Sequence, residues 1–316
     1  MINTETVLSA VVPVFALAIV GLLIRKANWL SEEADQSLLR VNINLLLPAL
    51  ILDKALGNPA LSQPRNLLMA PLVGVGTFVL GILVALASKP LHGLKQPEAQ
   101  RTFALSVGLY NYGYVPIPLA LLLFDSRTVG VLFVHNIGVE TALWTIGVML
   151  VSGQSVLTDW RKLVNGPLIA ILLAIVLNAL GWDALVPGVV RTAVNWLGLC
   201  AIPMALILIG AVMADHLGEF HSAAGWRSIF IAILLRIGVL PVLFLVLARL
   251  LPASVELKRV MLLQAAMPAA VFPILMARHY GGDPATALRI VVSTSLVGLV
   301  TIPLWIKFGL KFVLGA

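Results

Sequence analysis

The 316-residue chain alternates long apolar stretches with short polar ones. Most of the apolar stretches are about 20 residues long, which is the length that a helix needs to cross a membrane core of about 30 Å. The pattern therefore predicts an all-α integral membrane fold of ten transmembrane helices. They are expected at roughly Thr6–Ile24, Val41–Ala55, Asn66–Ser88, Thr102–Phe124, Thr128–Val151, Leu163–Leu180, Thr192–Ala214, Trp226–Leu250, Val260–Ala277 and Ile290–Ile306. The second is short, and we expect it to tilt, break or extend to Leu61.

Prolines recur at matching positions inside these stretches. Pro48 and Pro203 are 155 residues apart, and so are Pro118 and Pro273. A proline removes a backbone hydrogen bond and disrupts the preceding helical turn. A membrane protein tolerates such a break where the freed backbone is buried in protein or lines a cavity. Broken segments at corresponding places in two halves are typical of the binding site of a secondary transporter.

The chain divides near residues 152–162 into two halves of five predicted helices. An odd number of helices makes the second half enter the membrane from the opposite side, so the repeat is expected to be inverted. We therefore predict a single transmembrane domain over residues 1–316, with repeats 1–155 and 156–316.

Composition agrees with membrane residence. The chain is 60% hydrophobic and 11% charged, whereas a soluble domain is about 25% charged. The net charge of +7 is spread over short loops, so it does not indicate a nucleic-acid partner. Arg25 and Lys26 directly follow the first helix, which predicts both termini outside a cell (inner) membrane.

The strongest candidate site lies in the fourth and ninth stretches. Asn111 through Pro118 contains two prolines and a glycine, and Ala265 through Pro273 is its counterpart. Both are expected to unwind and cross near the middle of the membrane. The following half-helices would then present free N–H groups and positive dipole ends to an anion. The alternative is a pair of kinks used only for packing.

These and other blocks resemble the auxin efflux carrier family, which includes plant PIN-type carriers and bacterial permeases for small organic acids. The resemblance spans nearly the whole chain, and Pro116 departs from the small residue more usual there. The blocks are Val12-Pro13-Val14-Phe15 to Gly21, Leu47-Pro48-Ala49-Leu50, Asn111-x-Gly113-Tyr114-x-x-x-Pro118, Leu197-Gly198 to Pro203 and Gly210, and Ala265-Ala266-Met267-Pro268 through Ala277, Tyr280 and Asp283 to Ser293-Thr294 and Pro303.

The resemblance implies a scaffold of helices one, two, six and seven, a mobile core of the other six, and elevator-type alternating access. A homodimer through the scaffold is compatible with it. The implied substrate is a mono- or dicarboxylate, auxin-like or malate/malonate-like, held beside the crossing. The candidate substrate-binding residues are Asn111, Tyr112, Gly113, Pro116, Pro118, Pro268, Ala269, Pro273, Asn44, Gln264 and Arg236.

Ionisable side chains within membrane spans are functional candidates because burial is costly for them. Glu140 lies in the fifth stretch with His135 nearby, and these two are the candidate ion-coupling residues; Arg236 lies in the eighth stretch. Glu140 and Arg236 would either form a buried ion pair, or Glu140 would carry a coupling proton while Arg236 meets the substrate carboxylate. For Asn44 and Gln264, hydrogen bonding between helices is the alternative to substrate contact.

The sequence gives little support for other classes of membrane protein. A membrane-embedded enzyme would need a catalytic motif, and no His-Glu-x-x-His or Gly-x-Ser-x-Gly is present. No cofactor or metal is expected, because Asp215-His216-x-x-Glu219-x-His221 lacks an established metal spacing. Coupling to H⁺ or Na⁺, a carrier like the bile-acid–sodium symporters, and a channel stay open as alternatives. Cys200 is expected to be a small buried residue.

Overall fold

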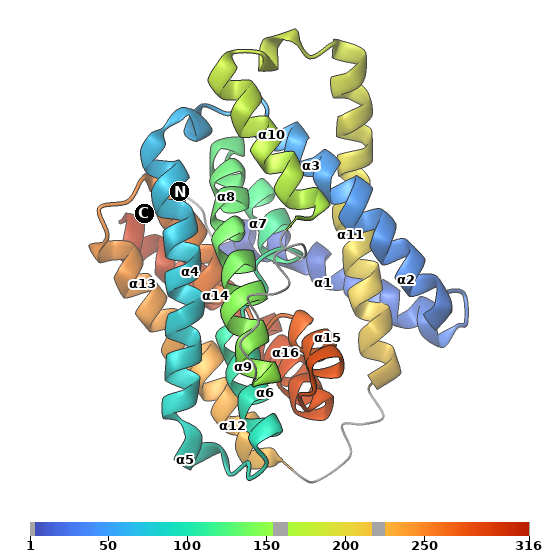
Figure 1. Cartoon of the computed structure of the whole chain (residues 1–316), viewed down its shortest axis with the longest axis vertical. Helices are drawn as coiled ribbons and strands as arrows, with labels where there is room; N and C mark the ends of the chain where they lie inside the picture. Colours follow the sequence, from blue (N-terminus) through green and yellow to red (C-terminus); the bar gives the residue numbers. More distant parts are fainter. Residues whose placement is uncertain (1–3, 154–163, 217–224, 316) are drawn as a thin grey trace.

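The computed structural model describes residues 4–153, 164–216 and 225–315. In these ranges the secondary structure is helical, with one isolated β-bridge and no strand, so the all-α prediction is confirmed (Figure 1). The first half contains α1 (Thr4–Lys26), α2 (Glu32–Val41), η1 (Asn42–Leu46), α3 (Leu47–Ala55), η2 (Pro59–Ser62), α4 (Pro64–Ala87), α5 (Lys89–His92), α6 (Pro97–Gly108), α7 (Pro116–Leu123), α8 (Ser126–Ala142), η3 (Leu143–Gly147) and α9 (Val148–Ser152).

The described part of the second half is also helical. Its elements are α10 (Gly166–Leu180), η5 (Asp183–Leu185), α11 (Gly188–His216), α12 (Trp226–Ile233), η7 (Leu234–Val239), α13 (Leu240–Leu250), α14 (Val255–Ala266), α15 (Phe272–Tyr280), α16 (Pro284–Gly309) and η8 (Leu310–Leu314).

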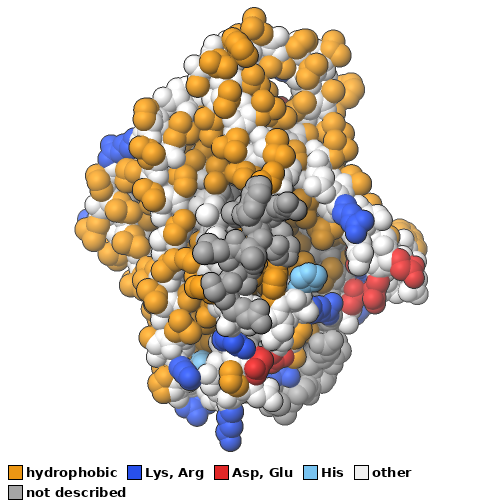
Figure 2. Space-filling view, in the orientation of Figure 1, with side chains coloured by type: hydrophobic (Ala, Val, Ile, Leu, Met, Phe, Trp, Pro, Cys, Tyr) orange, Lys and Arg blue, Asp and Glu red, His pale blue; other side chains and the backbone are white. Residues whose placement is uncertain are grey.

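Six continuous helical spans in the described ranges are long and apolar enough to cross a membrane. The apolar helix α10 is shorter, with 15 residues. The six spans are Glu5–Lys26, Pro64–Ala87, Ser126–Ser152, Gly188–Asp215, Trp226–Leu250 and Pro284–Leu314. Hydrophobic side chains cover most of the face seen in Figure 2, and charged ones gather mainly toward its lower and right-hand edges.

The second predicted span differs from expectation. It gains length at its beginning rather than toward Leu61, because helix runs from Glu32 to Ala55 through α2, η1 and α3. Ser31 caps the start of α2, and its hydroxyl accepts a hydrogen bond from Ala34 N. The wide turn η1 comes directly before Pro48, which has no N–H to continue the regular helical pattern.

Two groups of helices pack closely within themselves. The first contains α1, α3, α10 and α11, and the second contains α4, α6, α8, α13, α14 and α16. Figure 1 shows α11 and α3 on one side of the molecule and α4 and α13 on the other. The long contact between α1 and α11 depends on glycine: a Cβ at Gly210 would lie 1.8 Å from Ala18 O. Such close backbone approach is typical of helix packing in membranes.

Cys200 in α11 corrects one expectation. Its side chain is exposed on the protein surface rather than buried, and its thiol donates to Trp196 O one turn earlier. The helix therefore presents a face at Cys200 that packs on no other described helix.

The start of α8 is held by a polar cluster. Asp125 Oδ1 accepts hydrogen bonds of 2.9 Å from both the N–H and the hydroxyl of Thr128, and its other carboxylate oxygen lies 3.0 Å from Arg259 of α14. Partial burial tends to raise the pKa of Asp125, but these hydrogen bonds and the charge of Arg259 outweigh it and lower the pKa. The cluster ties an end of the first half to the second.

Candidate functional site

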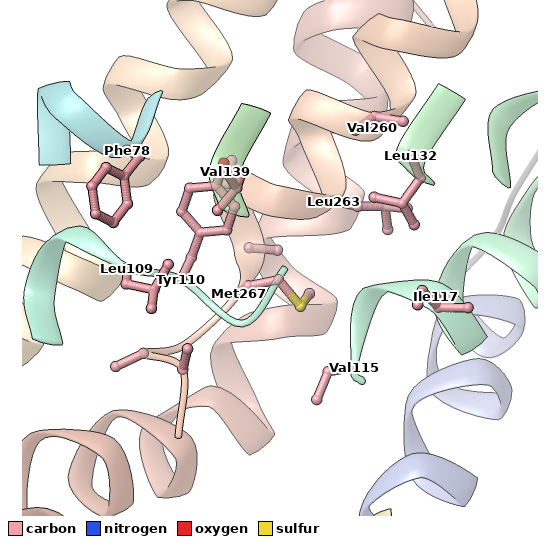
Figure 3. Close-up of a cluster of buried hydrophobic side chains, with 14 of the residues drawn as sticks. Phe78, Leu109, Tyr110, Val115, Ile117, Leu132, Val139, Val260, Leu263 and Met267 are labelled. Atoms are coloured by element: carbon pink, nitrogen blue, oxygen red, sulfur yellow. The ribbon is translucent and has the colours of Figure 1, made fainter. Parts of the chain in front are cut away.

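Two non-helical segments meet inside the bundle. The chain leaves helix between Gly108 and Pro116, and again between Ala266 and Phe272. Asn111 N donates to Pro268 O at 2.8 Å, and Ala270 N donates to Leu109 O at 2.9 Å. Tyr110 and Ala269 face each other in this short antiparallel pairing. Figure 3 shows the first segment, with Leu109 and Tyr110, passing beside Met267 of the second.

The composition of the segments explains why helix ends here. Pro116 and Pro118 lie in the first turn of α7, and Pro273 is the second residue of α15. Proline is tolerated in a first helical turn, where its missing N–H would have no partner within the helix, but not further inside. Pro268 also lacks an N–H, and it lies in the second non-helical segment, where its carbonyl joins the pairing. All four prolines are buried.

Neighbouring helices bind the freed backbone groups. Tyr112 O accepts hydrogen bonds from Asn136 Nδ2 of α8 at 2.9 Å and from Gln264 Nε2 of α14 at 3.2 Å. Ala269 N donates to Thr294 Oγ1 of α16 at 3.2 Å. The sequence showed Asn136 and Thr294 as polar residues in apolar spans, but their contacts with the broken segments were not foreseen.

The expectation of free N–H groups at the start of α7 is wrong. Pro116 and Pro118 have no N–H, and Ile117 N already donates to Gly113 O at 3.0 Å. An anion at this end would therefore meet the helix dipole without a hydrogen bond from the first turn.

One side of the crossing is open. Asn111 is 8% exposed, while Tyr112, Gly113 and Tyr114 are partly exposed. A Cβ built on Gly113 would have no neighbour within 4 Å. Asn111 Oδ1 accepts a hydrogen bond of 3.4 Å from Val115 N, but its Nδ2 donates to no group in the described ranges. The open side thus offers space and an amide donor.

Glu140 belongs to this open side. Its Oε2 accepts a hydrogen bond of 3.0 Å from Asn165 Nδ2, and it lies close enough to Tyr112 and Tyr114 to act on both electrostatically. Asn165, which sequence reasoning missed, also caps α10 by accepting from Leu168 N at 2.9 Å. The first helix group and the second therefore share a hydrogen bond through Glu140.

His135 and Arg236 lie on the buried side, behind Tyr110. His135 is 0% exposed, with Nε2 at 3.5 Å from the Tyr110 hydroxyl and Nδ1 at 3.3 Å from Asn136 Oδ1. The Tyr110 hydroxyl is also 2.8 Å from Thr77 Oγ1. In the described structure Arg236 forms no ion pair with Glu140, so the expected alternative of a buried Glu–Arg pair is not observed.

Asn44 forms no hydrogen bond with either segment of the crossing in the described structure. It is exposed, and its Nδ2 donates to Arg40 O in the same helical stretch at 2.9 Å, so it bridges to no other helix. Gln264, by contrast, is 1% exposed and reaches the crossing directly. Within the described ranges no three His, Cys, Asp or Glu side chains form a metal-binding group. Glu219 and His221 fall outside those ranges.

Comparison with protein families identifies the chain. The family model described as membrane transport protein matches residues 6–159 and 155–306. The chain belongs to this family, the auxin efflux carrier family. This confirms the resemblance found in the sequence, and it makes the protein a multi-pass membrane transporter.

Relatives of this transporter occur in archaea and plants. An uncharacterized transporter of Methanothermobacter thermautotrophicus is 26% identical over 313 residues, covering 96% of this chain and 97% of the relative. One from Methanocaldococcus jannaschii is 24% identical over 306 residues, covering 94% and 97%. Auxin efflux carrier component 7 of Arabidopsis thaliana is 29% identical over 157 residues, which are 48% of this chain and 25% of the plant protein.

Proposed function

We propose that this transporter carries a small organic anion, a mono- or dicarboxylate, through a site on the open side of the crossing. The observation that carries the proposal is the pairing of two broken helices beside open space at Gly113. Asn111 would donate its free Nδ2 to a carboxylate oxygen, with Tyr112 and Gln264 shaping the wall. Hydrogen bonds to the ion give the orientation, and the α7 and α15 dipoles add electrostatic attraction.

The mechanism we propose is elevator-type alternating access in a fold of ten membrane segments forming two inverted repeats. Matching packing supports the repeats: the first helix of each half packs on the second helical stretch of the other half, α1 on α11 and α10 on α3. The first helix group would be the fixed scaffold, and the second, which contains the crossing, would move as the core. The exposed apolar face of the scaffold would accommodate a homodimer. Arg25 and Lys26 support termini outside an inner membrane.

Glu140 would couple proton uptake to this movement. Its carboxylate belongs to the core, while its partner Asn165 belongs to the scaffold, so the hydrogen bond between them has to break when the core moves. An ionised carboxylate accepts this bond strongly, and protonation weakens its role as an acceptor. Protonation would therefore release the core. His135, which is bonded to Tyr110 and Asn136 instead, would support the crossing.

Uptake into proteoliposomes tests the proposal. Labelled malate, malonate and indole-3-acetate would be offered with and without an inward proton gradient, and we expect saturable uptake of at least one acid. Asn111→Ala should reduce that uptake more than tenfold, on the order of one charge-assisted hydrogen bond. Asn44→Ala, the same change at a residue whose side chain bonds only within its own helical stretch, should leave it unaltered. Lack of uptake by folded wild-type protein would refute the function, and normal uptake by Asn111→Ala would place the site elsewhere.

A further inference from the structure

Arg236 is a buried cation without a hydrogen bond. Its side chain is 0% exposed, and none of Nε, Nη1 and Nη2 has a hydrogen-bond partner in the described structure. Arginine stays protonated in proteins, so this position holds a permanent positive charge. A buried charge without a hydrogen bond destabilises the fold, so its presence here suggests a functional role.

Two aromatic rings hold the guanidinium in place. Its carbon lies 5.4 Å from the ring centre of Tyr110 and 5.2 Å from that of Phe244. These rings contact each other edge-to-face at 5.6 Å. Aromatic faces attract cations, which offsets part of the cost of burial. Tyr110 also belongs to the paired backbone of the crossing, so the charge lies directly behind the proposed site.

Local backbone geometry keeps Arg236 in this position. It lies in η7, a stretch with wide helical turns, which are frequent at functional sites. Trp305 Nε1 of α16 donates to Ile237 O at 2.7 Å, so the backbone directly after Arg236 is bonded to α16. The charge therefore moves with the crossing rather than swinging independently toward solvent.

We propose that Arg236 makes the site selective for anions over uncharged solutes, acting across Tyr110 by its electric field and without touching the solute. The inference rests on the proposed function, and it replaces the direct contact with a substrate carboxylate that the sequence suggested. Both the guanidinium and Tyr110 are enclosed, so a solute on the open side meets Asn111 and Tyr112, not Arg236. In the low-dielectric interior, however, the charge of Arg236 still attracts an anion that it does not touch.

The size of the effect follows from Coulomb's law. At an effective dielectric constant of about 20, a unit charge changes the binding of an anion on the order of tenfold even at a separation of about 10 Å, and by more at shorter separations. An uncharged solute of the same shape gains nothing from it. Removing the charge should therefore lower the preference for an acid over its amide about tenfold, with little change for the amide itself.

The test compares an acid with its uncharged amide as competitors of uptake in proteoliposomes. The acid would be whichever of malate, malonate and indole-3-acetate the wild-type protein takes up best. In Arg236→Gln the ratio of the two inhibition constants should fall about tenfold. Phe103→Leu serves as the matched control, because it removes a buried ring that packs on His92 and not on Arg236; it should lower the melting temperature and retain the ratio.

An unchanged ratio in folded Arg236→Gln would overturn the proposal, and so would a wild-type protein that binds acid and amide equally. If Arg236→Gln does not fold, Arg236→Met removes the charge with an apolar side chain of similar length, a replacement that buried charged positions often tolerate. It should lower the ratio likewise, and an unchanged ratio there would also overturn the proposal. Wild-type uptake tests the function and the ratio tests Arg236, so the two can fail separately.

Discussion

Thr294 offers a sharp test of how the crossing is held together. Its hydroxyl accepts a hydrogen bond of 3.2 Å from Ala269 N and donates one of 2.7 Å to Ile290 O in its own helix. Thr294 is 0% exposed and Ala269 is 1% exposed, so water cannot replace the lost partner. Thr294→Val keeps the shape of the side chain but leaves the Ala269 N–H without an acceptor.

The cost can be worked out from these contacts. An unsatisfied buried N–H costs about 1–3 kcal/mol. The carbonyl of Ile290 adds little, because it can keep its backbone bond within α16. In a chain of this length, 1 kcal/mol shifts the melting temperature by about 2–4 °C. We therefore expect Thr294→Val to melt several degrees lower and to lose transport, since the second broken segment becomes less ordered.

The assay needs a control from the same helix. Thr301 Oγ1 donates to Val297 O at 3.1 Å, a bond within its own helix, so Thr301→Val removes a hydroxyl without exposing the crossing. Melting in detergent, uptake in proteoliposomes and hydrogen exchange of the Ala269 amide would be measured for both variants, with Thr294→Ser expected to resemble wild type. If Thr294→Val behaves like Thr301→Val in all three measurements, the hydroxyl does not anchor the crossing.

Three further predictions test other parts of the structure. Glu140→Gln should abolish the pH dependence of uptake and Asn165→Ala should weaken it, whereas retained dependence in both would move coupling elsewhere. Gly113→Ala should fold normally, because nothing lies within 4 Å of the new carbon. Gly210→Ala should lower the melting temperature sharply, because its Cβ would clash with the backbone of α1. Equal melting temperatures for the two variants would contradict the packing. Asp125→Asn should cost a few tenths of a kcal/mol, since the carboxylate is half exposed. Because the pKa of Asp125 is lowered in the folded state, its carboxylate stabilises the fold above the unfolded value of 3.8. Between about pH 5 and about pH 3 the melting temperature of Asp125→Asn should therefore fall less than that of the wild type. An equal fall in both proteins would refute this.

Much of the crossing could be predicted from the sequence. Pro116, Pro118, Pro268 and Pro273 act on the backbone of their own segment, so their effect on the helix can be read locally. The same holds for the family, because it depends on blocks of residues along the chain. The prediction of free N–H groups at the start of α7 is wrong for a local reason: Pro116 and Pro118 have no N–H.

Other features depended on contacts between distant segments. Glu140 and Arg236 were natural candidates for an ion pair, but α8 directs Glu140 to Asn165 on the open side, while η7 places Arg236 behind Tyr110. Asn44 and Gln264 looked alike in the sequence, yet only Gln264 reaches the crossing. Periodicity and spacing say which residues share a helix, and they do not say which neighbour each face meets.

The amino-acid sequence is enough to predict a helical membrane protein of a transporter family with two segments that cannot remain helical. These properties follow from the transfer of apolar side chains into lipid and from the missing N–H of proline, and neither depends on a partner segment. The pairing of the two segments through Asn111 N and Ala270 N, the groups that bind the freed backbone and the positions of the buried charges come from the folded arrangement alone. Hydrogen bonds and electrostatic fields depend on distances between segments far apart in the chain, and packing alone sets those distances.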